Sequence, residues 1–126
     1  MKRIPVIITL LLCLALAGCT FSSGAGHTWN GDMAYTFNVY NSDDSQGFDV
    51  KAGQTIHIDY AAECEGGDLS LRLIDPEDQT VWEVSVGGSQ DDGSQDVKAE
   101  SDGRYVMQVK GEDAVNGNYD LKWTVE

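Results

Sequence analysis

Apolar and polar residues alternate with a period of two through most of the chain from Met33 onward. Seven stretches carry an apolar side chain at every second position, namely residues 33–39, 48–50, 56–60, 69–73, 82–86, 105–109 and 119–125. A weaker segment surrounds Val97. Alternation of this kind is typical of a strand with one buried face. About eight short strands without a helical period predict an all-β fold, an antiparallel two-sheet β-sandwich of the jelly-roll type.

The predicted core consists of the apolar positions of these stretches, because they share one face of each strand. They are Met33, Tyr35, Phe37, Val39, Phe48, Val50, Ile56, Ile58, Tyr60, Leu69, Leu71, Leu73, Trp82, Val84, Val86, Tyr105, Met107, Val109, Tyr119, Leu121, Trp123 and Val125. Polar stretches between the strands predict loops or turns, among them residues 41–46, 61–67, 75–78 and 87–96.

The first 18 residues follow a different pattern. Lys2 and Arg3 precede an apolar run over residues 4–16. That run is shorter than the roughly 18 to 20 residues that a membrane-spanning helix needs. A basic start, a short apolar run and small residues before a cleavage point predict a secretory signal peptide over residues 1–18.

The end of this segment, Leu16-Ala17-Gly18-Cys19, resembles the lipobox of bacterial lipoproteins. In that family the cysteine thiol receives a diacylglycerol, and cleavage makes the cysteine the first residue of the mature chain. The resemblance implies that Cys19 is the site of lipid attachment, with acyl chains such as palmitate. Two acyl chains hold a protein stably in a membrane, whereas one is marginal. The alternative is an ordinary signal peptide with an incidental cysteine.

The sequence therefore predicts that the chain has three parts. They are a signal peptide at residues 1–18, a lipidated cysteine with a flexible tether at residues 19–31, and a β-sandwich domain at residues 32–126. The tether is expected because its residues are small and polar, without an apolar period. We expect the lipid to hold the domain on the extracytoplasmic face of a cell membrane or an outer membrane.

The chain is strongly acidic. It has 21 Asp and Glu against 8 Lys and Arg, a formal net charge of −13. Loss of Lys2 and Arg3 with the signal peptide would leave 6 − 21 = −15. Such a surface repels polyanions, which makes nucleic acids and anionic glycans poor candidate partners. The acidic residues are interleaved with apolar ones, so they predict a solvated outer face.

Enzymatic motifs are absent from the sequence, including the common nucleophile, zinc and phosphate-binding patterns. A hydrolase or redox protein using His57, Asp59 or Cys64 remains the alternative, because His57 and Asp59 share one strand face. Glu63 and Glu65 flank Cys64, and negative charge nearby disfavours a thiolate. We therefore expect no catalytic activity and a structural or incidental thiol at Cys64, with an intermolecular disulfide or a redox role as the alternative.

Two acidic stretches are candidates for calcium. Residues 42–47 contain Asp43 and Asp44, and residues 89–94 contain Asp91 and Asp92. Loops of this kind offer the hard oxygen ligands that calcium prefers, although neither matches the twelve-residue calcium motif. The alternative is two solvated acidic turns. No other cofactor is expected.

Aromatic side chains outside the core are the candidates for sugar stacking. Trp82 and Trp123 belong to the predicted core, whereas Trp29 and Tyr40 do not, so these two are the expected exposed aromatics. Trp29 could instead cover the first strand.

Five stretches resemble the bacterial pre-peptidase C-terminal domain. They are residues 48–56 (FDVKAGQTI), 67–71 (GDLSL), 75–76 (DP), 102–109 (DGRYVMQV) and 117–121 (GNYDL). That family is a jelly-roll sandwich appended to exported proteins, without catalytic activity, and it attaches to surfaces, collagen or carbohydrate; some members bind calcium. This resemblance and the lipobox together imply a lipid-anchored binding module of the cell envelope, with a glycan or protein as partner. A structural envelope lipoprotein without a small ligand is the alternative.

Overall fold

In the computed structural model, the described part of the chain is residues 23–126, apart from the side chains of Thr28 and Trp29. It contains seven strands: β1 (Ser23–Trp29), β2 (Asp32–Tyr40), β3 (Asp43–Val50), β4 (Thr55–Ile74), β5 (Thr80–Val86), β6 (Gln90–Lys98) and β7 (Gly103–Val125). All pairings are antiparallel, so the predicted all-β sandwich is confirmed. Within residues 23–126 no helix has the length and apolar character needed to cross a membrane. The signal peptide and Cys19 lie outside the described residues.

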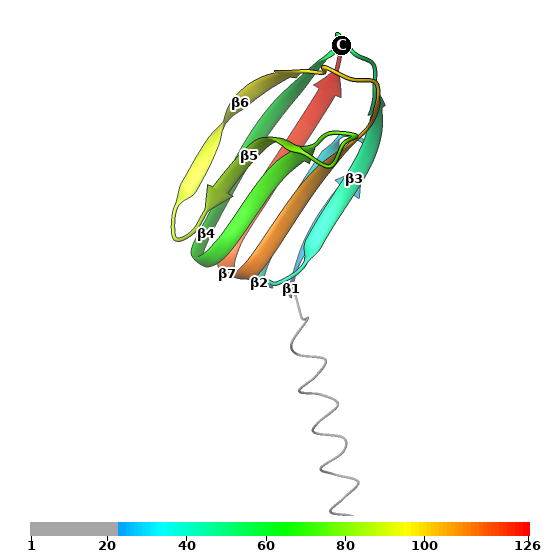
Figure 1. Cartoon of the computed structure of the whole chain (residues 1–126). Coiled ribbons are helices and arrows are strands. Elements are labelled where there is room, and N and C mark those ends of the chain that lie inside the picture. The colour runs from blue at the N-terminus through cyan, green and yellow to red at the C-terminus, as the bar shows by residue number, and fades with distance from the viewer. Residues whose placement is uncertain (1–22) are drawn as a thin grey trace, which may run out of the picture.

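Two long strands, β4 and β7, build both layers of the sandwich (Figure 1). The first layer has the order β1-β2-β7-β4-β6 and uses the second half of β7 and the first half of β4. The second layer has the order β3-β7-β4-β5 and uses the opposite halves. One continuous network of strand pairs therefore folds over on itself and encloses a core.

Both long strands turn from one layer to the other at the same level. The β4–β7 register shifts between Gly66 and Asp68, where Gly67 has a φ of 74°. Asp113 and Asn116 of β7 also have positive φ values, 52° and 48°. A β-bulge of this kind bends a strand and increases its twist. The predicted loop at residues 61–67 is therefore wrong, because strand pairing continues through it to Gly66 and Val115.

The core lies between the two layers and matches most of the prediction. Its fully buried members include Met33, Ile56, Leu69, Leu71, Leu73, Met107, Val109 and Leu121. Val39 is an error of the prediction, since it is 36% exposed, whereas its neighbour Tyr40 is 1% exposed. The alternation of β2 breaks between Phe37 and Tyr40, and Asn116, which lies between their partners Gly117 and Ala114 on β7, has a positive φ. Gly111 leaves room for the Tyr40 ring, because a Cβ at that position would overlap it.

Two strands lie where the sequence predicted none. β1 occupies residues 23–29, which were assigned to the flexible tether, and it pairs with β2 from Trp29 to Ser23. β6 occupies most of the predicted loop at residues 87–96 and pairs with β4. In β6 every side chain is exposed except the partly buried Val97, so it has no apolar period to recognise.

Candidate functional site

The outer face of the first layer carries a row of polar side chains around one small residue. Ala61 of β4 pairs with Asp92 of β6 on one side and with Asp120 of β7 on the other. Residues two positions along each strand face the same way. Two residues beyond Ala61 on β4, and therefore on the same face, Glu63 pairs with Gln90 and Asn118. Three strands thus present hydrogen-bonding groups on one surface.

Three hollows, open to solvent, follow each other along the seam between β4 and β6. Their volumes are about 250, 420 and 370 Å³. The first and third share Ala61 and Asp92, and the first and second share Glu63 and Gln90. We call this continuous depression the outer groove. Its other lining residues include Asp59, Tyr60, Glu65, Ser94, Asn116, Asn118, Asp120 and Lys122.

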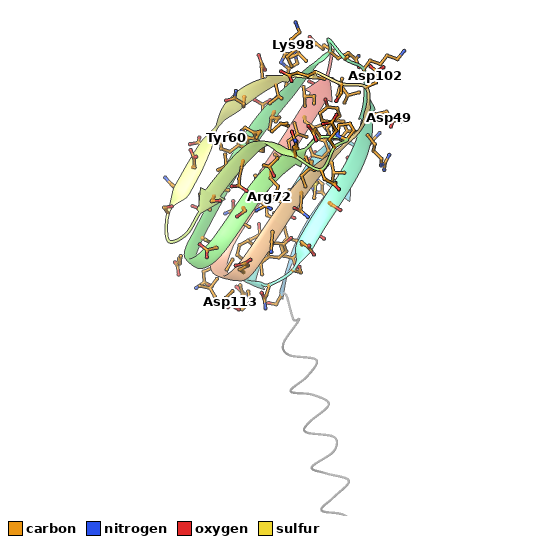
Figure 2. All side chains as sticks on the ribbon, in the orientation of Figure 1. Asp49, Tyr60, Arg72, Lys98, Asp102 and Asp113 are labelled. Carbon is orange, nitrogen blue, oxygen red and sulfur yellow. The ribbon has the colours of Figure 1, made fainter. Side chains whose placement is uncertain are left out.

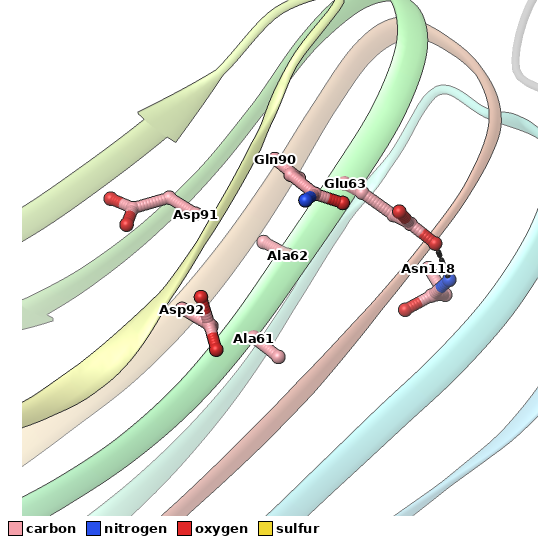
Figure 3. Close-up of a pocket in the computed structure, with 7 residues that line it drawn as sticks. All are labelled: Ala61, Ala62, Glu63, Gln90, Asp91, Asp92 and Asn118. Atoms are coloured by element: carbon pink, nitrogen blue, oxygen red, sulfur yellow. Dashed lines mark hydrogen bonds between the residues drawn. The ribbon is translucent and has the colours of Figure 1, made fainter.

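Several polar groups in the outer groove are held by their neighbours. The Asn118 side-chain amide donates to Glu63 Oε1 at 2.6 Å, as Figure 3 shows. Ser94 Oγ donates to Asp59 Oδ1 at 2.5 Å. The Asn116 amide donates to Glu65 Oε2 at 3.0 Å. Each carboxylate keeps a second oxygen, so these side chains are positioned and still able to accept hydrogen bonds from a ligand.

The lining of the outer groove is acidic. It contains six carboxylates, Asp59, Glu63, Glu65, Asp91, Asp92 and Asp120, and Lys122 as its single cation. The hollow on the second layer is more balanced in charge, because Arg72, labelled in Figure 2, and Lys110 line it together with Asp68 and Glu112. Arg72 also forms an ion pair with Glu83 at 2.9 Å. A negatively charged ligand would be repelled from the outer groove.

Tyr60 is the aromatic residue that lines the outer groove. Its ring is half-buried against Trp82, with centroids 5.4 Å apart and planes at 60°. Burial, followed by the nearby Asp91 and Asp92 carboxylates, raises the pKa of the Tyr60 hydroxyl. Like any tyrosine with a pKa at or above the ordinary value, Tyr60 carries a protonated hydroxyl at neutral pH.

The expected exposed aromatics are not found there. Tyr40 is buried, so its assignment as an exposed aromatic is wrong. The side chain of Trp29 lies outside the described part of the structure. Trp123, at 6% exposure, belongs to the core as predicted. Trp82 is half-buried and packs against the core.

The four candidate calcium ligands lie on strands at opposite edges of the molecule. Asp43 and Asp44 belong to β3, and Asp91 and Asp92 to β6. The two predicted loops are thus largely strand, and the structure does not bring the two pairs together. Within residues 23–126, no group of three or more His, Cys, Asp or Glu side chains could hold a metal ion.

Asp44 has a different set of contacts. Its Oδ2 accepts hydrogen bonds from the Tyr40 hydroxyl at 2.9 Å and the Tyr119 hydroxyl at 3.4 Å. Burial is the main cause that raises the pKa of both tyrosines, and the Asp44 charge adds to it. This contact joins β3 of the second layer to β2 and β7 of the first.

The possible catalytic residues are not assembled into a nucleophile site. His57 Nδ1 lies 2.6 Å from Asp96 Oδ1, and its Nε2 lies 3.3 Å from Glu126 Oε2. Asp59 interacts with Ser94. Cys64 is buried on the opposite face of β4, where its Sγ donates to the Val86 carbonyl at 3.6 Å.

Sequence reasoning missed most of the outer groove. Tyr60 packs against the core as predicted, but its place along the groove was not foreseen, and the outward positions of β4 and β7 were treated as a solvated face. Their alternation with the core positions was the available signal, but it does not say which strands become neighbours.

No protein family model and no curated protein sequence matches the chain. Among solved structures, CBM4, a carbohydrate-binding module, superposes with a TM-score of 0.53 at 10% identity, over 86% of this chain and 79% of that one. The enzymatically active domain of tailspike protein 4 from bacteriophage CBA120 has a TM-score of 0.50 at 13% identity, over 84% of this chain and 19% of that one. The pre-peptidase C-terminal domain of a Bacillus anthracis collagenase aligns with a TM-score of 0.48 at 18% identity, over 75% of this chain and 89% of that one. The chain therefore shares the jelly-roll sandwich fold, and its resemblance to the pre-peptidase family stays a prediction.

Proposed function

We propose that the protein is a non-catalytic module that binds a neutral, hydroxyl-rich glycan in the outer groove. The observation that carries this proposal is the row of three contiguous hollows along β4 and β6. An extended polymer needs such a continuous surface, and the fixed carboxylates and amides offer acceptors and donors for sugar hydroxyls.

Two further observations support a neutral glycan as the ligand. The fold is the one found in CBM4, a carbohydrate-binding module. The acidic lining disfavours sulfated or carboxylated polymers, since like charges repel at close range. The separate surroundings of His57, Asp59 and Cys64 favour binding over catalysis.

A longer side chain on the floor of the outer groove should abolish binding. Ala61→Gln fills the centre of the groove, whereas Ser70→Gln makes a similar change on β4 in the second layer, outside the groove. We expect affinity electrophoresis through neutral glucans and galactans to retard the wild type and Ser70→Gln but not Ala61→Gln. Carboxylated and sulfated polysaccharides should retard none of the three.

Two results of the electrophoresis would contradict the proposal. Equal retardation of both variants would place binding outside the outer groove. Failure of every neutral glycan to retard the wild type would favour a structural envelope protein without a small ligand.

The proposal includes attachment to a membrane through a lipid on Cys19, on the extracytoplasmic face of the cell envelope. Its support is the lipobox-like sequence Leu16-Ala17-Gly18-Cys19. Cys19→Ser should abolish labelling of the protein by a radioactive fatty acid in growing bacteria. The control is Cys13→Ser, which should keep full labelling, and label that persists in Cys19→Ser would contradict the proposal.

A further inference from the structure

β6 is attached to the rest of the domain without buried side chains. Seven of its residues, from Gln90 to Asp96, are exposed, and Val97 is partly buried. It lies at the margin of the sandwich and pairs with β4 alone (Figure 1). Burial of apolar surface is the main force that holds a strand in place. β6 therefore depends mainly on its backbone ladder, on the contact of Val97 with the core and on a few polar contacts.

Besides the Ser94–Asp59 hydrogen bond, those polar contacts centre on His57. Its Nδ1 faces Asp96 of β6 at 2.6 Å, and its Nε2 faces Glu126, the residue after β7, at 3.3 Å. A doubly protonated imidazole can donate to both carboxylates, whereas a neutral one has a single N–H. The contact therefore ties β4 to β6 and to the end of the chain most firmly when His57 is charged.

We propose that β6, which forms one side of the outer groove, separates from β4 when His57 loses its proton. We call the contacts of His57 with Asp96 and Glu126 the latch. All three hollows include residues of β6, so release would remove one side of the groove. The effect of release on ligand binding rests on the proposed function, whereas the latch itself does not.

The charges around His57 fit this role. On the same face of the layer, Asp96 and Lys98 come from β6, Asp59 from β4 and Lys122 from β7. Glu126 follows β7 and faces His57. Without the imidazolium, three carboxylates share this corner with two lysines. Exposed ion pairs stabilise little one by one, so the latch matters only because Val97 is the one β6 side chain that packs against the core.

The direction of the pH effect follows from the same contacts. The hydrogen bond to Asp96 is the largest cause that raises the pKa of His57 above its ordinary value of 6.5, and the charges of Asp96 and Glu126 add to it. A group with a raised pKa in the folded state stabilises that state below its ordinary pKa. This stabilisation is lost as the pH rises through the raised value, so β6 should open on the alkaline side.

Hydrogen exchange of backbone amides tests the latch in the unliganded protein. We expect the protection factors of β6 amides paired with β4 to fall as the pH rises from about 5 to about 8, the range in which histidine changes its charge. The opening constant should rise by the ratio of the His57 acid constants in the open and latched states. His57→Gln cannot titrate and should keep one low protection factor throughout. Amides between β4 and β5 should not change.

Two results would overturn the proposal. One is the same pH dependence of β6 protection in the wild type and in His57→Gln. The other is a parallel loss of protection in β4 and β7, which would mean that the whole domain opens. A protein that shows the latch but retains no glycan at either pH would contradict only the proposed function.

Discussion

Gly117→Ala is expected to unfold the domain or to lower its free energy of unfolding by at least about 3 kcal/mol, the upper end of what overpacking costs. Gly117 is buried in β7, directly opposite Cys64 of β4. A Cβ at this position would overlap the Glu63 carbonyl oxygen and come within 2.8 Å of the Cys64 Cα. These are backbone atoms of a central strand, so they cannot move without breaking the β4–β7 ladder. The same displacement would shift Glu63, and with it the outer groove.

Gly66→Ala is the matched control, because Gly66 lies on the same pair of strands. A Cβ there would meet only the Val115 side chain, at 3.3 Å. We expect a change of less than about 1 kcal/mol, since a side-chain methyl group can move aside. Urea denaturation followed by tryptophan fluorescence measures both variants. Equal stability of Gly117→Ala and the wild type would mean that β4 and β7 pair in another register.

Asp44→Ala is expected to lower the free energy of unfolding by about 2 to 4 kcal/mol, because two buried hydroxyls lose their acceptor. Tyr40 and Tyr119 are 1% and 2% exposed, so water cannot easily replace the carboxylate. Asp44→Asn should lose less, since its amide oxygen can still accept. The tyrosine hydroxyls join the two layers near the end of β2, and thermal or urea denaturation would report their loss.

Asp43→Ala is the control for this change. Asp43 is exposed and adjacent in sequence, so its replacement should alter stability by no more than about 0.5 kcal/mol. Equal effects of the two substitutions would contradict a special role for Asp44.

The same measurements, made with added calcium and then with a chelator, test the calcium prediction for Asp43, Asp44, Asp91 and Asp92. An unchanged unfolding midpoint in the wild type would contradict calcium binding by the folded protein.

The fold was predictable where burial leaves a mark on the sequence. Leu69, Leu71 and Leu73 alternate with polar residues and are fully buried. β6 left no such mark, because its strand structure depends on backbone pairing with β4 and hardly on side-chain burial. The joining of two predicted strands into β4 was also hidden, since Gly66 and Gly67 are as typical of a loop as of a bulge.

The candidate site was less predictable than the core for a related reason. Its polar residues come from three strands that are far apart in sequence, and Ala61, Asp92 and Asp120 meet only through strand register. Tyr40 illustrates the same limit, because the missing side chain of Gly111 and the hydroxyl acceptor on Asp44 decide its burial.

The sequence alone determined that the domain is an antiparallel sandwich, which side chains form most of its core, and that its surface is acidic. These properties depend on local alternation and on residue counts, which each strand carries by itself. Only the tertiary structure decided that β4 and β7 each serve both layers, that β6 completes an outer groove, and that His57 faces Asp96 and Glu126 instead of Asp59. Those features arise from which strands pair and in what register, and the free energy of pairing is shared among residues that are distant along the chain.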